Sequence, residues 1–464
     1  MTLSRTERPL FEHQKITVNA SQKTDRLFDM SDPGTGKTRA HLEAWSIRRK
    51  EGGKCLLVIA PKSLLEPAWG NDIEEFTPDF TYSVAYANNR EKAFAAEADI
   101  YITNTDAVKW LALKKPAFFE KFDSIVIDES TAFKHRTSGR SKALNKIKKY
   151  FKYRAALTGT PNSNSITEIW NQVFFLDDGK RLSTKFFAFR NQVCTPTQVG
   201  AQAHMIKWTD RPGSLEAVTG LIKDISVRHN IDECMDLPEN IDRYIKFNLN
   251  PAHLVKYIKM EKDAFLKLED GNVDAVNAAV LRNKLLQIAS GAVYTEGGEY
   301  TLLDSKRYEL VTDLAQEREN TVVFFLWRHQ KEQLIKEADK RGISFEVIDG
   351  TVPVRRRKLI VDAFQAGFFK ELLIHPKTGA HGLTLTKGRA TIWPSPIYEP
   401  ELFKQGKHRI VRSGQEKKTE NLMVLATGTV EKNVYETFSG KNTKMVNFLD
   451  LINYCQNERS DDNE

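Results

Sequence analysis

Residues 26–45 read RLFDMSDPGTGKTRAHLEAW, a short apolar run followed by a glycine-rich loop and then a helical pattern. Strand, glycine loop and helix in this order are typical of a site that holds phosphate groups. Gly34 and Gly36 let backbone amides approach phosphate oxygens, Lys37 supplies a cation and Thr38 offers a hydroxyl to Mg²⁺. The strict pattern G-x-x-x-x-G-K-[ST] has Ser31 at its first glycine, and an ordinary glycine turn before a helix is the simpler alternative. The context predicts a nucleotide-phosphate site.

A second chemical signal lies about ninety residues further on. SIVIDES (124–130) is an apolar strand pattern that ends in the adjacent carboxylates Asp128 and Glu129. Mg²⁺ beside phosphates needs an oxygen ligand such as Asp128, and Glu129 can polarise the water that attacks a γ-phosphate. An Asp-Glu pair after a strand is otherwise an ordinary solvated strand end. After a phosphate loop, the pair predicts ATP hydrolysis.

The rest of the chain shows the rhythm of a parallel α/β protein. Apolar, β-branched runs separated by helix-length stretches predict strands at 55–61, 99–104, 124–130 and 154–160, and again at 320–327, 344–350, 371–376, 389–396 and 421–427. Residues from about 162 to 318 lack this rhythm and are predicted to be mostly helical. Leu237-Pro238, within the polar stretch 232–243, discourages helix continuation and predicts a boundary there. We therefore expect two α/β domains, 1–235 with a helical extension from about 162, and 236–464.

Composition narrows the class of protein and of partner. The chain has 464 residues, 41% of them hydrophobic, enough for large buried cores. Lys and Arg number 69 against 61 Asp and Glu, a net charge of +8 that favours an anionic partner. The four cysteines (Cys55, Cys194, Cys234 and Cys455) form no C-x-x-C pair, which argues against a zinc site and a disulfide framework. No run is long and apolar enough to span a bilayer, and no signal peptide is evident. We expect a cytoplasmic protein that does not contact membranes.

With these motifs in order, the chain resembles helicase superfamily 2, and in particular its SWI/SNF-like branch. RPLFEHQ (8–14) is similar to the family's adenine-reading segment, with Gln14 as the base contact. Further similar stretches are 57–76 (motif Ia), 102–108 (motif Ib), 157–177 (motif III), 347–364, 377–396 and 405–415. The resemblance implies two tandem RecA-like lobes, each a parallel sheet flanked by helices, with an ATP cleft between them and a helical insertion.

The most specific later motif is Gln405-x-x-x-Arg409-x-x-Arg412. Two arginines three apart are expected on one face of a helix, from which both would reach the triphosphate bound by the first lobe. Together with the first-lobe motifs, the implied catalytic residues are Lys37, Asp128, Glu129, Arg409 and Arg412. The implied ATP-binding residues are Gln14, Pro33, Gly34, Thr35, Gly36, Lys37, Thr38, Gly382 and Gln405, with Thr38 and Asp128 as ligands of Mg²⁺.

The DNA contacts that the resemblance implies follow several of these motifs. They are Lys62, Ser63, Thr103, Asn104, Lys134, Thr160, Trp327, Arg328 and Thr378. Residues 134–154 carry nine Lys or Arg and no acidic residue, so they suit either phosphate binding or a solvated basic helix. Trp327 is alternatively plain core, and the run Arg355–Lys358 is alternatively an exposed helix face. The acid box reads Asp128-Glu129-Ser130-Thr131, without the family's usual histidine, which puts the coupling of ATP and DNA sites in doubt.

These observations predict a DNA-stimulated ATPase that moves along DNA through its phosphate backbone. As a compact phage-type motor, it is expected to unwind or branch-migrate forked and branched DNA in recombination, repair or replication, as a monomer. A double-strand translocase that remodels protein–DNA complexes without separating strands is the main alternative. A non-catalytic nucleic-acid clamp and a small-molecule P-loop kinase are two others. The intact residues Lys37, Asp128, Glu129, Arg409 and Arg412 favour an active motor.

Overall fold

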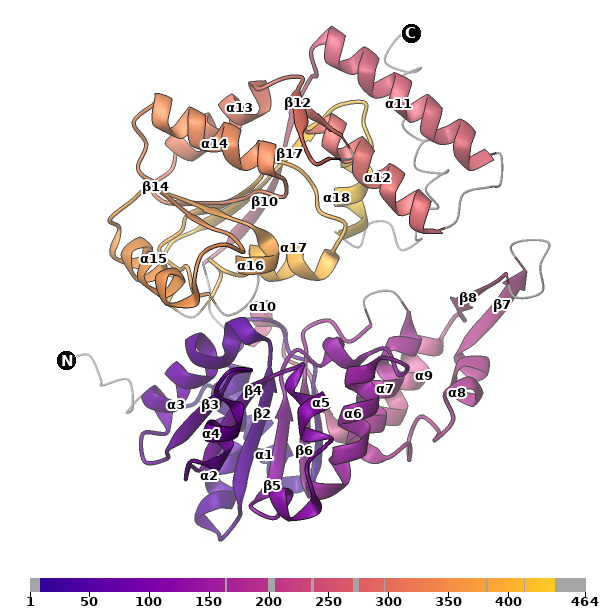
Figure 1. The fold of residues 1–464 in the computed structure, drawn as a ribbon, viewed down its shortest axis with the longest axis vertical. Helices are drawn as coiled ribbons and strands as arrows, with labels where there is room; N and C mark the ends of the chain where they lie inside the picture. The colour runs from indigo at the N-terminus through magenta and orange to yellow at the C-terminus, as the bar shows by residue number, and fades with distance from the viewer. Residues whose placement is uncertain are drawn as a thin grey trace. The chain divides into compact units, whose positions relative to one another are not determined.

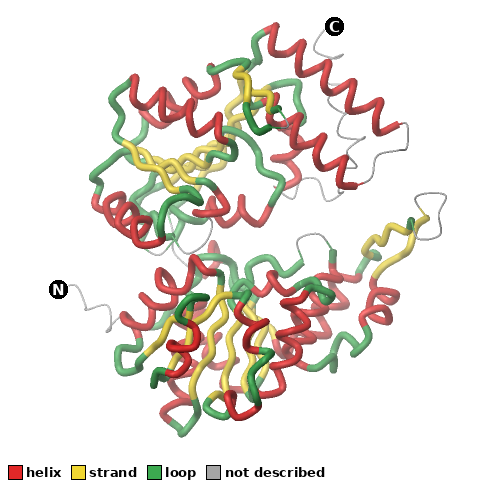
Figure 2. The backbone as a smooth tube through the Cα atoms, in the orientation of Figure 1, coloured by secondary structure: helices red, strands yellow, loops and turns green. Residues whose placement is uncertain are grey.

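The computed structural model describes residues 9–162, 165–198, 205–234, 238–269, 275–295, 297–379, 383–412 and 414–438. The chain divides into two compact units, residues 1–236 and 237–464. Each unit contains a parallel β-sheet with helices on its faces (Figures 1 and 2). This is the architecture of two RecA-like lobes that the sequence predicts, and it is confirmed.

The sheet of the first unit has seven strands in the order β3-β4-β2-β5-β6-β1-β9, all of them parallel. The strands are β1 (Arg26–Asp29), β2 (Cys55–Ala60), β3 (Tyr82–Ala85), β4 (Ile100–Asn104), β5 (Phe122–Ile127), β6 (Tyr153–Leu157) and β9 (Ser226–Val227). Central strands such as β2 and β5 are buried almost throughout, which explains their continuous apolar sequence. The carboxyl ends of β1, β5 and β6 lie at one edge of the sheet and carry the motifs.

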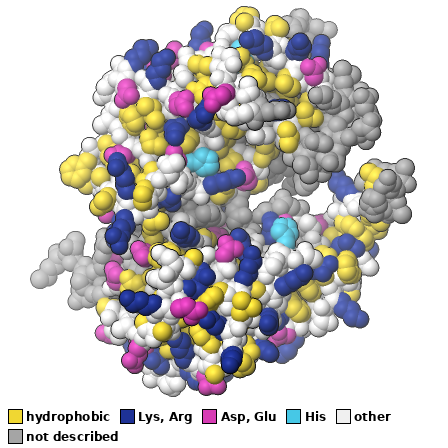
Figure 3. Space-filling view, in the orientation of Figure 1, with side chains coloured by type: hydrophobic (Ala, Val, Ile, Leu, Met, Phe, Trp, Pro, Cys, Tyr) yellow, Lys and Arg dark blue, Asp and Glu magenta, His cyan; other side chains and the backbone are white. Residues whose placement is uncertain are grey.

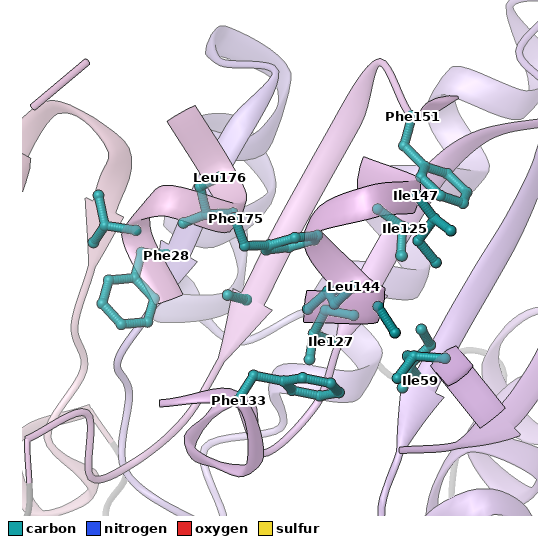
Figure 4. Packing of buried hydrophobic residues seen from close by; sticks show 14 of the residues in the cluster. Phe28, Ile59, Ile125, Ile127, Phe133, Leu144, Ile147, Phe151, Phe175 and Leu176 are labelled. Atoms are coloured by element: carbon teal, nitrogen blue, oxygen red, sulfur yellow. The ribbon is translucent and has the colours of Figure 1, made fainter. Parts of the chain in front are cut away.

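Helices cover both faces of this sheet and extend beyond it. They are α1 (Glu12–Lys23), α2 (Lys37–Lys50), α3 (Asn71–Phe76), α4 (Arg90–Ala95), α5 (Ala107–Leu111), α6 (Gly139–Ile147), α7 (Ile169–Asp177), α8 (Phe186–Val193), α9 (Ser214–Ile222) and α10 (Ile231–Cys234). Figure 4 shows the core on one face, where Ile125 and Ile127 of β5 pack with Leu144 of α6 and Phe175 of α7. Side chains at alternate positions of a strand point to opposite faces of the sheet. Ile125 and Ile127 of β5 therefore pack in the cluster on one face, and Val126 packs in the cluster on the other.

The second unit has a six-stranded parallel sheet in the order β10-β17-β16-β13-β15-β14. Its strands are β10 (Asn240–Phe247), β13 (Thr321–Phe324), β14 (Phe345–Ile348), β15 (Glu371–Ile374), β16 (Ala390–Trp393) and β17 (Thr419–Ala426). The helices are α11 (Pro251–Glu269), α12 (Ala275–Ala289), α13 (Lys306–Gln316), α14 (Arg328–Lys340), α15 (Val354–Ala366), α16 (Pro376–Gly379), α17 (Pro400–Lys407) and α18 (Glu431–Phe438).

A buried ion pair ties several of these elements together. The guanidinium of Arg307 (α13) makes two hydrogen bonds of 2.9 Å to the carboxylate of Glu431 (α18). It also donates to Ser395 Oγ and to the carbonyl oxygen of Ala289. Both residues are at most 2% exposed, so the two charges are compensated inside the unit, by each other and by the neighbouring oxygens.

The expectation that 162–318 is mostly helical is only partly correct. Besides helices, this stretch contains the antiparallel hairpins β7 (Cys194–Gln198) with β8 (Ile206–Asp210) and β11 (Ala292–Tyr294) with β12 (Tyr300–Leu302). It also contributes β9 to the first sheet and β10 to the second. The reason is exposure: most residues of β7, β8 and β10 are not buried, so no continuous apolar run marks them as strands.

On the face shown in Figure 3, Lys and Arg side chains are spread over the first unit with Asp and Glu between them. In the described part of the chain, no helix combines the length and apolar character needed to cross a membrane. Cys55, Cys194 and Cys234 are free thiols, and Cys455 lies outside the described residues.

Candidate ATP site and nucleic-acid surfaces

The phosphate loop, residues 32–38, connects the end of β1 to the start of α2. Gly34 and Gly36 have φ of +93° and +74°, backbone conformations that favour glycine. A Cβ on Gly36 would lie 2.2 Å from Nε2 of Gln14. That Gln14 amide donates to the carbonyl oxygen of Gly36 at 3.3 Å, and its Oε1 accepts from the amide of Phe11. The structure thus places the predicted adenine-contacting residue directly against the loop.

Lys37 begins helix α2 and folds back over the loop. Its Nζ donates to the carbonyl oxygens of Ser31 at 2.7 Å and Asp32 at 3.0 Å. Thr35 closes the same turn, because its Oγ1 donates to the carbonyl oxygen of Asp32 at 2.9 Å. Thr38 is half-buried in the first turn of α2. Within the described residues, the hydrogen-bond acceptors of Lys37 Nζ are therefore backbone oxygens, which phosphate oxygens can replace.

Under the loop lies a buried histidine–carboxylate pair that the sequence did not reveal. His41 Nε2 (α2) is 3.1 Å from Oδ2 of Asp29, the last residue of β1, and the amide of Ser31 donates to Asp29 Oδ1. Burial by itself raises the pKa of Asp29, but His41, Lys37 and Ser31 outweigh it and lower the pKa to about 2. Asp29 is therefore a carboxylate that joins the strand, the loop and the helix.

The acid box, residues 128–131, follows β5. Asp128 accepts from Nε1 of Trp69 at 2.9 Å and from the amide of Glu129 at 2.9 Å. Burial raises the pKa of Asp128, while Trp69 and the charge of Lys37 oppose the shift. The charge of Lys37 therefore acts on Asp128, and the two predicted catalytic groups belong to one electrostatic site. The Trp69 contact could not be predicted from the sequence, because an indole in a motif stretch does not reveal its partner.

Glu129 has a left-handed backbone, with φ of +51° and ψ of +57°. This conformation costs a non-glycine residue roughly 1–2 kcal/mol. Glu129 then begins the short 3₁₀ helix of Ser130–Phe133. This conformation turns the chain sharply at the end of the strand, immediately after Asp128. Strained backbone conformations of this kind cluster at functional sites.

The motif III loop, residues 158–162, joins both parts of the site. A Cβ on Gly159 would lie 2.8 Å from Cδ of Pro33, so only a glycine lets this loop approach the phosphate loop so closely. On the acid-box side, Ser130 Oγ donates to Gln172 Oε1 at 2.7 Å, and Gln172 Nε2 donates to the carbonyl oxygen of Pro161 at 2.8 Å. The serine of the unusual acid box is thus hydrogen-bonded, through one buried glutamine, to motif III.

The segment after β9 also fixes the phosphate loop. The amides of Met30 and Asp32 donate to the carbonyl oxygens of Val227 and His229. In return, the amide of His229 donates to Ser31 Oγ at 3.1 Å. These contacts could not be predicted from the sequence, because they join residues about 200 positions apart, mainly through backbone atoms.

In the second unit, the predicted arginines lie past the end of a helix. Helix α17 ends at Lys407, so the expectation that Arg409 and Arg412 share a helix face is wrong. The reason is that Arg409 turns back: its Nε donates to the carbonyl oxygen of Gln405 at 3.0 Å and its Nη1 to that of Leu383 at 3.2 Å. Arg412 Nε donates to the carbonyl oxygen of His408. Gln405 and Arg409 are buried, Arg412 is half-buried, and Gly382 lies outside the described residues.

The first-unit residues that were predicted to contact DNA differ in accessibility. Lys62 is exposed, and Ser63 and Thr160 are half-buried. Asn104 Oδ1 accepts from Arg90, and Lys134 Nζ forms an ion pair with Glu168 at 2.9 Å. Thr103 is fully buried, and its hydroxyl donates to the carbonyl oxygen of Ala85. The Thr103 side chain is therefore not accessible to a DNA strand.

Several cations of the basic stretch 134–154 form ion pairs within the first unit. Lys148 and Arg154 are buried and share the carboxylate of Asp178, at 3.0 and 2.9 Å. Arg140 pairs with Asp106 at 2.7 Å. Neither phosphate binding nor a solvated basic helix describes the whole stretch, because only some of its cations are exposed.

In the second unit, Trp327 is half-buried against an apolar cluster and stacks on His329, with ring centroids 5.8 Å apart. Arg328 is exposed, and its Nη2 lies 3.2 Å from the carboxylate of Glu299. Thr378 is half-buried in α16. In the run 355–358, Arg357 is half-buried and the other three residues are exposed on α15.

Magnesium fits the residues present. In the described chain no group of three or more His, Cys, Asp and Glu side chains could enclose a metal ion. Mg²⁺ at nucleotide sites takes one or two protein oxygens together with phosphate oxygens and water. The Asp128 carboxylate, under the influence of Lys37, and the Thr38 hydroxyl, one residue after Lys37, are the donors that such a site requires.

Comparison with known proteins agrees with this geometry. Residues 20–290 match the model of the SNF2-related domain, and residues 306–414 match that of the helicase conserved C-terminal domain. A phage protein, "Putative protein p41" of Acyrthosiphon pisum secondary endosymbiont phage 1, is 26% identical over 92% of this chain and 95% of its own length. "Putative ATP-dependent helicase/translocase YwqA" of Bacillus subtilis (strain 168) is 24% identical over 89% of this chain. The chain spans 45% of the length of YwqA.

Among solved structures, the Hef helicase domain of Pyrococcus furiosus has a TM-score of 0.55 at 14% identity, over 94% of this chain and 98% of that one. The Sulfolobus solfataricus SWI2/SNF2 ATPase core in complex with dsDNA has a TM-score of 0.46 at 21% identity, over 95% and 92%. The Hef likeness supports the fold. The SNF2-related domain matches residues 20–290, which is more than half of the chain. The chain therefore belongs to the SNF2-related family of helicase-type ATPases.

Proposed function

We propose that this protein is a DNA-stimulated ATPase that translocates along DNA and acts on forked or branched DNA, by unwinding or branch migration, in recombination, repair or replication. The observation that carries the ATPase part is the convergence of the phosphate loop, acid box and motif III loop at one edge of the first sheet. Gly159 of the motif III loop packs closely against Pro33 of the phosphate loop, and Gln172 links Ser130 of the acid box to Pro161 of motif III by hydrogen bonds. The family membership and the phage relative support the motor and its setting.

The first-unit residues have distinct roles in this proposal. Lys37 exchanges its two backbone acceptors for oxygens of the β and γ phosphates, and the amides of the glycine loop hold the same groups. Glu129 orients the attacking water and accepts its proton. Asp128 and Thr38 would hold Mg²⁺, which would supply neutralising charge at the phosphates.

Arg409 and Arg412 are proposed to complete the ATP site as charge-stabilising groups from the second unit. Both have backbone carbonyl oxygens as partners, which phosphate oxygens can replace. An arginine that meets the transferring phosphoryl group is typically worth about 10³–10⁵ in rate. Hydrolysis would then be linked to the arrangement of the two units, as a translocating motor requires.

The proposed DNA contacts are mainly to phosphates. Thr103 is excluded because it is buried. The retained candidates each have some accessible surface; they are Lys62, Ser63, Asn104, Lys134, Thr160, Trp327, Arg328 and Thr378. Phosphate contacts make binding tolerant of sequence and sensitive to salt. The alternative remains a double-strand translocase that displaces bound proteins without separating strands.

A paired displacement assay separates these functions. The full chain is incubated with ATP and either a forked duplex or a blunt duplex that carries a third, triplex-forming strand. Release of a strand from the fork supports unwinding. Triplex release without fork opening supports the translocase, and no release in either assay, with Lys37→Ala as the inactive control, contradicts the motor.

A further inference from the structure

The β7–β8 hairpin stands at one end of the first unit, beside α8 and away from the parallel sheet (Figure 1). Its base is firmly held. Cys194 is buried in the core, and the Asp210 carboxylate accepts from Ser165 Oγ at 2.7 Å and from the amide of Ile166 at 2.8 Å. Beyond the base, the strand residues are exposed except for the half-buried Trp208. A two-stranded hairpin is marginally stable alone, so these anchors and the packing of Trp208 against the core hold it in place.

Aromatic rings and guanidinium groups meet where this hairpin adjoins α8. The guanidinium of Arg190 lies 3.7 Å from the ring centroid of Trp208. The guanidinium of Arg136 lies 4.7 Å from the centroids of both Phe186 and Phe187. Phe187 is 54% exposed although it is a large apolar residue. We call these five residues the aromatic–arginine platform.

The platform and its surroundings are cationic. In the described residues 185–198 and 205–211, the cations are Lys185, Arg190, Lys207 and Arg211, and the acid is Asp210, whose oxygens already serve Ser165 and Ile166. Within the described chain, neither Arg136 nor Arg190 has a carboxylate at ion-pair distance, and Arg190 Nε has no acceptor. A stacked guanidinium keeps its N–H edge for an oxyanion such as phosphate.

We propose that the aromatic–arginine platform binds single-stranded DNA. The exposed Phe187 ring and the guanidinium planes beside it offer stacking surfaces, which only unpaired bases can use. Arg136 and Arg190, which have no carboxylate partner in the described chain, offer phosphate contacts. A duplex presents no free base faces, so the platform favours a single strand. This inference rests on the proposed function, in which unwinding releases such a strand, and it adds a binding surface in the first unit separate from the motif residues.

Fluorescence anisotropy of the full chain with a labelled oligo-dT, without ATP and over a salt series, tests the platform. Phe187→Ala removes a stacking surface and is expected to weaken binding about tenfold with an unchanged salt slope. Arg190→Gln removes a phosphate contact and is expected to reduce the slope of log K against log salt by about 0.7. Phe187→Trp should retain affinity, and Lys50→Ala, an exposed cation elsewhere in the first unit, should behave as wild type.

Duplex-stimulated ATP hydrolysis is measured on the same variants and is expected to be unchanged. Weaker binding by Phe187→Ala, restored in Phe187→Trp, supports the platform. Wild-type affinity and salt slope in both Phe187→Ala and Arg190→Gln, or no oligo-dT binding by the wild type, overturns it. A wild type that no DNA stimulates contradicts the proposed function instead, and the anisotropy result is judged independently of that outcome.

Discussion

At the scale of single residues, the ATP site is a set of charged groups, each with a defined neighbour. Lys37 contacts backbone oxygens, Asp128 is held by Trp69, and Glu129 has a strained backbone. The residues that are proposed to act on phosphate are therefore held in place by contacts within the protein. Such preorganisation is how enzymes stabilise developing charge without rearrangement.

Glu129→Gln should retain nucleotide binding but lose turnover. The amide keeps the size of the side chain and removes the group that accepts the proton of the attacking water. We expect kcat to fall by about 10²–10⁴ with little change in the Kd of ATP, measured by steady-state hydrolysis and fluorescent-nucleotide binding. An unchanged kcat contradicts the assigned role.

Arg412→Ala should lower kcat more than nucleotide affinity, because a contact to the transferring phosphoryl group strengthens in the transition state. Arg409 is unsuitable for this test, since its side chain also holds Leu383 and Gln405 in the fold. Single-turnover hydrolysis and nucleotide titration separate the two effects. Loss of affinity alone would assign Arg412 to binding and not to rate.

At the scale of elements, buried strands were predictable and exposed ones were not. β2, β5, β13 and β17 each contain an apolar run, because helices cover both faces of each sheet. β10 (NIDRYIKF) is an edge strand with polar, exposed positions, so its sequence does not distinguish it from a loop or helix. The loops that hold phosphate were predictable from glycine and lysine spacing. The contacts of Asp29, Trp69 and Gln172 depend on tertiary packing and were not.

Glu371, the first residue of β15, provides an element-scale prediction about pH. It is 1% exposed, neither carboxylate oxygen has a hydrogen-bond partner in the described chain, and burial raises its pKa to about 7 against the weaker effects of Lys370 and Arg341. A carboxyl whose folded pKa is raised contributes stability that is complete below about pH 4.5 and lost as pH rises through about 7.

Glu371→Gln should therefore stabilise the second unit above pH 7, by up to about 3 kcal/mol, and have little effect near pH 4.5. Thermal melting of wild type and variant at pH 5 and pH 8 measures the difference. Lys336→Gln, at an exposed position of α14 that does not act on Glu371, serves as the control for a change of surface charge. Equal melting temperatures of wild type and Glu371→Gln at pH 8 would contradict the argument.

At the scale of the whole molecule, the chain consists of two compact units with separate cores. The phosphate loop, acid box and motif III belong to the first unit, whereas Gln405, Arg409 and Arg412 belong to the second. In the proposed function, ATP hydrolysis requires both sets of residues. Hydrolysis would therefore be linked to the arrangement of the two units. This division is the basis of the proposed motor.

Arg307→Ala tests whether the two units unfold separately. Removing the arginine leaves the Glu431 carboxylate buried without its charge partner, which typically costs about 3–5 kcal/mol. Differential scanning calorimetry should show one transition moved to lower temperature and the other unchanged. If all unfolding transitions moved to lower temperature together, the two units would form one cooperative structure.

The central claim is that DNA drives ATP hydrolysis at the phosphate loop. The most direct measurement is steady-state hydrolysis by wild type and Lys37→Ala with no nucleic acid, single strand, blunt duplex, fork and four-way junction, at two salt concentrations. We predict strong stimulation by forks and junctions, weaker at high salt and absent in Lys37→Ala. Normal turnover by Lys37→Ala, or DNA binding by the wild type without any turnover, would contradict it.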